Sequence, residues 1–214
     1  HRTLQQFAWI NILFTRVRHL LIQRVVHRME SDPARSYHLV DLGAGACDTP
    51  AWLLRLCKKR GLKLQITACD HDPRVVDFAH RCHGRLEGLH ICLRDAAELG
   101  GLDPIDFVFA SHLLHHLPDN RAGALLALLP GSRAQLILLA DIERSLHTYL
   151  GYYLAASVLF HRSYAREDGL LSIRRAFRLE EIRDLLRATG GEAAHYRVER
   201  MSPARLVLEW SPRK

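Results

Sequence analysis

Acidic and glycine residues at the ends of apolar runs are the groups in this sequence best suited to hold a ligand. The stretch Val40–Pro50 contains Asp41, followed by two closely spaced glycines, Gly43 and Gly45. Glycine allows left-handed backbone and lets a ligand approach more closely than a Cβ would permit. The apolar residues before this loop predict a buried parallel strand, and residues 51–60 predict a helix. Strand, loop and helix predict the first unit of a doubly wound α/β sheet, with a ligand at the carboxyl ends of the strands.

The spacing of the glycines separates two classes of nucleotide cofactor. A dinucleotide fingerprint requires a third glycine where this chain has Asp48, whose carboxylate would repel a pyrophosphate. A cofactor that carries a positively charged sulfonium and ammonium would instead tolerate acidic side chains around it. The Tyr-x-x-x-Lys pair of short-chain dehydrogenases is also absent. The motif Asp41-x-Gly43-x-Gly45 resembles the first motif of class I S-adenosylmethionine-dependent methyltransferases.

Three later landmarks extend this resemblance over roughly residues 37–210. A second strand at 64–70 ends in Asp70, a third at 90–95 ends in Asp95, and a fourth at 105–111 ends in Ser111. The resemblance implies that Asp70 binds the ribose hydroxyls of the cofactor and that Asp95 and the next amide read its adenine edge. It implies a cofactor site formed by Asp41, Gly43, Ala44, Gly45, Asp70, His71, Asp95, Ala96, Ser111 and His112. The expected cofactor is S-adenosylmethionine, with S-adenosylhomocysteine as product and no metal.

Each of these residues has an alternative role. Asp70 and Asp95 would serve equally as helix N-caps, since helix starts are predicted after both. Cys47 departs from the family pattern, which commonly has a glycine there. We expect it to narrow the loop near the methionine end of the cofactor, and a small buried thiol is the alternative.

Histidines after the fourth strand are the candidates for proton transfer. Residues 111–119, Ser-His-Leu-Leu-His-His-Leu-Pro-Asp, resemble the corresponding segment of small-molecule methyltransferases. A neutral histidine at His115 or His116 would take the proton of a phenol or carboxyl oxygen, and His112 is a third option. The alternative is that these side chains cap or pack the next helix. An acceptor that is already ionised would need no base.

Charge and cysteine content limit the function classes. The net charge of +7 would favour binding to the phosphates of a nucleic acid. The arginines are scattered along the sequence, however, and the Asn/Asp-Pro-Pro-aromatic motif of base-methylating enzymes is missing. We therefore expect a small acceptor, anionic or bound to a carrier, rather than RNA. An RNA methyltransferase and a cofactor-binding protein without transferase activity remain the alternatives. Five cysteines without Cys-x-x-Cys spacing indicate reduced thiols and a cytoplasmic protein.

Two segments outside the strand-helix alternation are expected to cover the site. Residues 3–30 predict an amphipathic helix or helix pair, either a lid or a peripheral membrane anchor. The insertion 142–177 contains an apolar helix at 149–160 and resembles a subgroup found with polyketide and aromatic natural-product pathways. It suits an aromatic or lipid-like acceptor, methylated on oxygen. Its candidate substrate-binding residues are Tyr149, Tyr152, Tyr153, Arg174 and Arg175.

The rest of the sequence closes a single expected domain over residues 1–214. A helix is predicted at 179–189, ending at a Gly-Gly pair, and two strands at 194–201 and 205–210 predict an antiparallel hairpin. The expected fold is a doubly wound, seven-stranded, Rossmann-like sheet in the order 3-2-1-4-5-7-6. Its parts are the helical lid 1–30, the cofactor-binding core 37–141, the insertion 142–177 and the final helix and hairpin 178–214. The sequence leaves the acceptor, the oligomeric state and the residues before His1 open.

Overall fold

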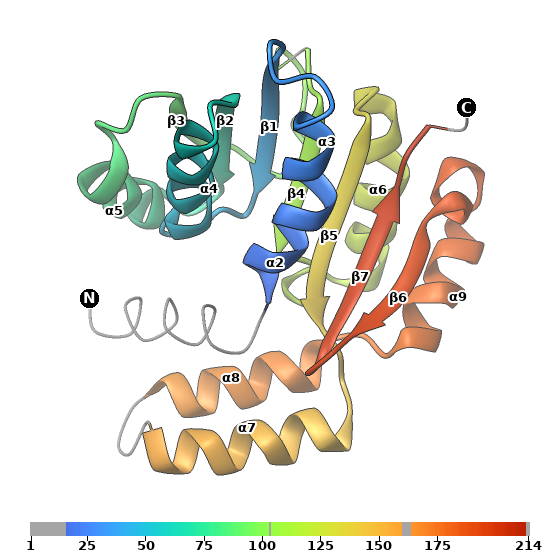
Figure 1. Cartoon of the computed structure of the whole chain (residues 1–214). Coiled ribbons are helices and arrows are strands. Elements are labelled where there is room, and N and C mark those ends of the chain that lie inside the picture. The colour runs from blue at the N-terminus through green and yellow to red at the C-terminus, as the bar shows by residue number, and fades with distance from the viewer. Residues whose placement is uncertain (1–15, 103, 160–163, 213–214) are drawn as a thin grey trace.

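The centre of the molecule is a seven-stranded sheet in the order β3-β2-β1-β4-β5-β7-β6 (Figure 1). The computed structural model describes residues 16–102, 104–159 and 164–212. Strands β3, β2, β1, β4 and β5 are parallel, and β7 is antiparallel to both of its neighbours. The strands are β1 (Ser36–Leu42), β2 (Lys63–Asp70), β3 (Leu89–Leu93), β4 (Phe107–Ser111), β5 (Leu136–Ile142), β6 (Arg197–Met201) and β7 (Arg205–Trp210). The predicted strand order is confirmed.

Helices cover both faces of the sheet, because consecutive side chains of a strand point to opposite sides. On β1, Leu39 belongs to one core and Val40 to the other, and on β4 the same holds for Phe107 and Val108. The first core is closed by α4 (Asp48–Lys59) and α5 (Pro73–His83). The second is closed by α6 (Asp119–Leu128) and α9 (Leu179–Thr189). Packing on both faces holds the strands in place, and with them the carboxyl ends at which a ligand site can form.

The N-terminal helical segment is part of the first core. It consists of α2 (Val17–Leu21), a π-helical turn η1 (Ile22–Val26) and α3 (His27–Met29). Its apolar side chains are buried: Val17, Leu20, Leu21, Val25, Val26 and Met29. Arg24 pairs with Glu199 at 2.8 Å, and Arg28 pairs with Glu209 at 3.1 Å, so its polar side is held by the final hairpin. The apolar face of this described segment is therefore not available to a membrane. Residues 1–15 of the predicted segment lie outside the described residues.

The insertion forms two helices rather than one. They are α7 (Leu146–Leu159) and α8 (Tyr164–Arg175), and Figure 1 shows both beneath the carboxyl ends of β1, β4 and β5. The sequence predicts the first of these helices but not the second. No described helix is both long and apolar enough to span a bilayer.

Element boundaries differ from the sequence-based expectations at a few positions. Helix α4 begins at Asp48 rather than at residue 51, with that acid in its first turn, where the helix dipole favours negative charge. Strand β3 ends at Leu93, before Asp95, and a turn rather than a helix follows. Residues 191–195 form a 3₁₀ turn instead of the start of β6. None of these shifts moves a strand end by more than a few residues.

Candidate active site

The loop after β1 has the tight geometry that its glycines predict. Gly43 and Gly45 adopt φ values of 68° and 57°, in the left-handed region. A Cβ added to Gly43 would lie 3.1 Å from Cδ1 of Leu113, so the loop packs closely against the segment after β4. The N–H of Gly45 donates to Oδ2 of Asp70 at 3.0 Å, and the N–H of Ala44 donates to the carbonyl of Cys69 at 3.0 Å. The end of β2 thus holds the loop in place.

Asp41 is a buried carboxyl group at the end of β1. Only 3% of the residue is exposed, yet it lines the main cavity, and its side chain makes no hydrogen bond or ion pair within the described part of the chain. Burial and the charge of nearby Asp70 raise its pKa well above the usual range. A buried carboxyl without a partner is stabilised by a cation that enters the cavity.

The acids at the ends of β2 and β3 occupy different environments. Asp70 is largely buried and accepts hydrogen bonds from the N–H groups of Gly45 and Asp72. The N-cap of α5 is Asp72, which accepts from the N–H of Arg74, so Asp70 is not that cap. Asp95 is exposed and accepts from the N–H of Ala97 in a turn. His71 is exposed next to Asp70, and Ala96 is half-buried beyond β3.

Cys47 occupies the N-cap position of α4 in a left-handed conformation, with φ 61°. This conformation explains why glycine would also suit the position. Its side chain is 1% exposed, packs in the first core and does not line the cavity. The expectation that it narrows the cofactor loop is therefore wrong, because the thiol points into the core. Burial and the surrounding acids raise the pKa of this thiol, which keeps it neutral.

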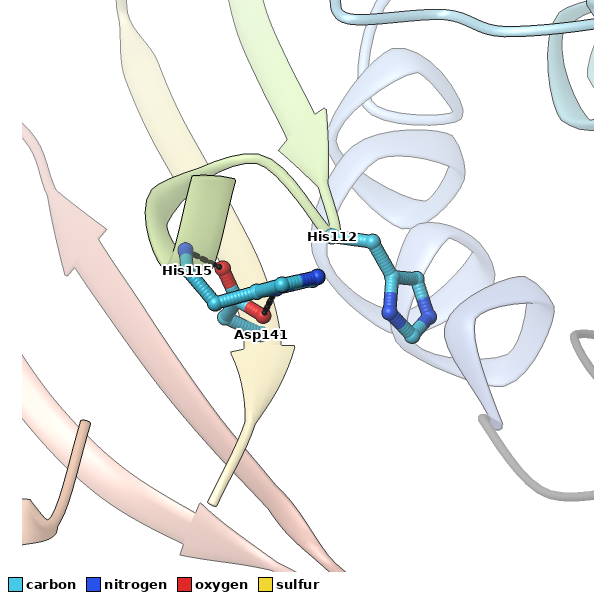
Figure 2. Close-up of side chains that lie close together, drawn as sticks. All are labelled: His112, His115 and Asp141. Carbon is cyan, nitrogen blue, oxygen red and sulfur yellow. Dashed lines mark hydrogen bonds and ion pairs between the residues drawn. The ribbon is translucent and has the colours of Figure 1, made fainter. Parts of the chain in front are cut away.

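His115 and Asp141 form a buried dyad, drawn in Figure 2. The ring Nδ1 of His115 lies 2.6 Å from Oδ1 of Asp141, and its backbone N–H donates to Oδ2 at 3.1 Å. The two side chains are only 2% and 7% exposed. Burial acts to raise the pKa of Asp141, but hydrogen bonds from the ring of His115 and from the N–H of Ile142 oppose it, and the pKa is held at about 2. An ionised Asp141 fixes the proton of His115 on Nδ1 and leaves the lone pair on Nε2.

The other two histidines of this segment lack such a partner. His112 follows β4 in a left-handed conformation, with φ 59°, and its Nε2 accepts a hydrogen bond from Arg205. Burial, and then the charge of Arg205, lower the pKa of His112 well below its usual value. His116 is exposed, and burial and the neighbouring His115 lower its pKa. Of the three histidines, only His115 has a carboxylate that orients its ring and a ring nitrogen without a described partner.

His112, His115 and Asp141 also lie close enough together to be considered as metal ligands. One ligand atom of each falls within 4.8 Å of the others. Nδ1 of His115 is engaged with Asp141, and Nε2 of His112 accepts from the guanidinium of Arg205, whose positive charge would repel a cation. The donor set therefore fits a hydrogen-bonded network better than a metal centre.

A cavity of about 590 Å³ connects the glycine loop to the dyad. This volume is within the range of small-molecule sites. Its floor is formed by the ends of β1, β4 and β5, and its outer wall by α7 and α8. Among the residues predicted for the site, the cavity is lined by Asp41, Gly43, Ala44, Gly45, Ser111, His112, His115, His116, Tyr152 and Arg175. Asp70 lies behind the loop, and Asp95 lies further along the same edge.

The remaining residues predicted for acceptor binding lie away from the cavity. Arg174 donates to the hydroxyl of Tyr149 at 2.9 Å on the surface. The guanidinium of Arg166 lies over the ring of Tyr153, which is 41% exposed. Of the three tyrosines, Tyr152 lines the cavity, and Tyr149 and Tyr153 do not.

The carboxylate of the dyad and the buried arginine of the site are missing from the sequence-based prediction. Asp141 ends β5 as Asp70 ends β2, so the same signal, an acid at the end of an apolar strand, was available for it. Arg205 begins β7 and is 3% exposed on the cavity wall. A single arginine beside Ser202–Pro203 carries no pattern that indicates burial.

Comparison with known proteins agrees with this architecture. Residues 40–128 match the family model described as a methyltransferase domain. No curated protein sequence matches the chain significantly. Several hundred solved chains resemble it.

Three solved structures illustrate that likeness. Magnesium protoporphyrin IX methyltransferase from Synechocystis PCC 6803, with bound SAH, is 18% identical, with a TM-score of 0.58 over 91% of this chain and 84% of that one. The plantazolicin methyltransferase BpumL, with a pentazolic desmethylPZN analog and SAH, is 12% identical, with a TM-score of 0.67 over 97% and 89%. Mitomycin 7-O-methyltransferase is 19% identical, with a TM-score of 0.55 over 83% of this chain and 49% of that one.

At these identities the solved structures establish the fold, and the family model supplies the independent sequence match. That match spans the glycine loop, the β2 and β3 ends and the segment after β4. The sheet order, with its reversed β7, is the same one that the sequence predicts for this family. Residues 40–128 are thus similar to methyltransferase domains, and the chain has the fold of the class I S-adenosylmethionine-dependent methyltransferases.

Proposed function

We propose that this chain transfers the methyl group of S-adenosylmethionine to an oxygen of a small aromatic or lipid-like acceptor, with His115 as general base. The observation that carries the proposal is the buried His115–Asp141 dyad on the wall of a cavity that also contains the glycine loop. Bound S-adenosylmethionine supplies the electrophilic methyl carbon. The protein has to hold the cofactor, exclude water and prepare the acceptor oxygen.

The residues at the β1 end fit the cationic part of the cofactor. Asp41 is buried, faces the cavity and makes no described hydrogen bond, so an ammonium or sulfonium would satisfy it. Position 43 of the loop carries no Cβ, because the side chain of Leu113 occupies the space that a Cβ would need. Asp70, held between two backbone N–H groups, retains further lone pairs for hydroxyl donors such as those of a ribose.

His115 is placed to remove a proton from the acceptor. The bond to Asp141 orients its ring and stabilises the imidazolium that forms when Nε2 takes the proton. A hydroxyl that loses its proton as it attacks is a better nucleophile, and such assistance contributes about 10²- to 10⁴-fold. A hydroxyl that is still protonated when it binds needs this step, which is why the dyad favours O-methylation of such a group.

Helices α7 and α8 are proposed to enclose the acceptor. They contribute Tyr152, Leu171 and Ile173 to the cavity wall, so an aromatic or apolar body has matching surface there. Helix α2 reaches the same region, since its first residue, Val17, lines the cavity. Outside the cavity, α7 exposes Leu146, Leu150 and Leu154.

The test is a methyl-transfer assay with purified protein, labelled S-adenosylmethionine and a panel of phenols and hydroxy acids. Formation of S-adenosylhomocysteine together with an O-methyl product supports the proposal. Binding of S-adenosylhomocysteine by calorimetry without turnover of any acceptor would instead support a cofactor-binding protein. Absence of cofactor binding would reject both. Methylation on carbon or nitrogen would reject the assignment to oxygen.

A further inference from the structure

Arg205 is a buried cation at the acceptor end of the cavity. It begins β7, where it lies opposite Ile142 at the end of β5, and only 3% of the residue is exposed. Burial lowers the pKa of its guanidinium to about 10, although the negative charge of Asp141 acts to raise it. The group therefore remains charged at neutral pH. Burying a charge is costly unless it is paired and hydrogen-bonded.

The hydrogen bonds of Arg205 are incomplete. One N–H donates to Nε2 of His112, and another makes a long bond of 3.4 Å to the carbonyl of Ala140. Its Nε is buried and has no partner. Among the described residues, no carboxylate forms an ion pair with this guanidinium. Asp141, the nearest acid in electrostatic terms, is engaged by His115 and by the N–H of Ile142.

The position of Arg205 in the sheet separates it from the cofactor loop. Strands β4 and β5 lie between β7 and β1, and neighbouring strands are about 4.8 Å apart. Arg205 contacts His112, beyond the end of β4, on the side of the dyad, whereas Asp41 and the glycine loop lie at the end of β1. An anion that satisfies Arg205 is therefore on the acceptor side of the cavity.

We infer that Arg205 binds a carboxylate of the acceptor, beside the hydroxyl that His115 deprotonates. This inference rests on the proposed function and adds the substrate class: a hydroxy acid rather than a neutral phenol or alcohol. Guanidinium and carboxylate pair through two parallel hydrogen bonds, and each terminal nitrogen of Arg205 uses one N–H within the protein and keeps a second. The carboxylate would also neutralise the charge that the fold buries.

Arg175 is a second cation on the cavity wall, supplied by α8 from the opposite side. It is exposed, so solvent screens it, whereas Arg205 is shielded. Selectivity for an anion is accordingly assigned to Arg205. Arg174, which bonds Tyr149 outside the cavity, provides a matched control.

The experiment measures binding of two matched ligand pairs to the protein saturated with S-adenosylhomocysteine. The pairs are 2-hydroxybenzoate with 2-hydroxybenzamide, and 3-hydroxy-2-naphthoate with its carboxamide. We expect the wild type to bind each carboxylate at least tenfold more tightly than its amide. Arg205→Met should reduce this ratio to near one, Arg205→Lys should retain part of it, and Arg174→Met should leave it unchanged. Melting temperatures establish that each variant is folded.

Three results would overturn the inference. The first is a wild type without carboxylate preference, including one that binds neither pair. The second is a preference that survives in folded Arg205→Met. The third is a loss of S-adenosylhomocysteine affinity in Arg205→Met, which would assign the guanidinium to the cofactor. Failure of the proposed function is distinct, because it appears as a wild type that does not bind S-adenosylhomocysteine or does not transfer methyl groups.

Discussion

Asp141 holds His115 at two points, through the backbone N–H and through the ring Nδ1. Because β5 supplies the carboxylate and the turn η2 (Leu114–His116) after β4 supplies the histidine, the dyad ties together two neighbouring strand ends at the floor of the cavity. A ring fixed in this way has little freedom to rotate. Orientation and tautomer are both set before any acceptor arrives.

The dyad predicts a defect in turnover rather than in cofactor binding. His115→Gln removes the base and should lower kcat by about 10²- to 10⁴-fold with an accepted phenol, while the Kd for S-adenosylhomocysteine stays within a few-fold. His116→Gln is the matched control, since this exposed neighbour has no carboxylate partner within the described residues, and it should retain most activity. Equal losses of kcat in the two variants would show that His115 is not the general base.

Asp141→Asn tests the orienting carboxylate separately. An amide cannot accept from both the N–H and the ring Nδ1 of His115, so the tautomer with the lone pair on Nε2 loses its support. We expect kcat to fall in the same direction as in His115→Gln, and the double variant to be no worse than His115→Gln alone. The free energy of unfolding should drop by about 1–3 kcal/mol, because a buried group is left unsatisfied. Full additivity of the two losses in kcat would argue that the residues act independently.

The raised pKa of Asp41 predicts that cofactor binding releases a proton. Its pKa is raised by burial and by Asp70, so in the cofactor-free protein the carboxyl group holds a proton above the pH at which a free aspartate loses it. An entering ammonium favours the ionised form and expels that proton at any pH between the usual and the raised pKa. Calorimetric titration with S-adenosylhomocysteine in buffers of different ionisation heat measures the release. Asp41→Asn should abolish it and weaken binding.

The same shift makes a prediction about stability. A carboxyl whose pKa is raised on folding contributes stability below its unfolded pKa and loses that contribution as the pH rises through the folded pKa. Asp41→Asn should therefore stabilise the cofactor-free protein relative to wild type, increasingly as the pH rises. Melting temperatures between pH 5 and pH 8, with Asp72→Asn as a surface control, test the sign. A difference that does not change with pH would contradict a raised pKa at Asp41.

Sequence patterns predict the sheet because each strand is a short apolar run ended by an acid, a glycine or a turn. Asp41, Asp70 and Asp141 all end parallel strands, and such ends meet at one edge. The face of α7 could not be predicted in the same way. This helix is apolar on all sides, so its sequence does not distinguish Tyr152, which lines the cavity, from Tyr153, which is exposed. Arg205 is buried through tertiary packing, which no local pattern records.

The packing of α7 against α8 provides the final prediction. Helix α8 presents Gly169 to the ring of Tyr152, and a Cβ added at Gly169 would lie 2.1 Å from the tyrosine hydroxyl oxygen and 2.2 Å from Cζ. Gly169→Ala must therefore displace Tyr152 from its place on the cavity wall. Gly151→Ala is the matched control, because Gly151 also lines the cavity but a Cβ there meets nothing within 4 Å.

If α7 and α8 enclose the acceptor, Gly169→Ala should raise KM for an accepted phenol or lower kcat by about tenfold or more, since small displacements at a site are costly in rate. The affinity for S-adenosylhomocysteine should change little, because the glycine loop and Asp70 lie at the ends of β1 and β2, away from this contact. Gly151→Ala should have neither effect and should raise stability slightly, as alanine favours a helix interior. Unchanged kinetics in a folded Gly169→Ala variant would show that the two helices do not shape the acceptor site.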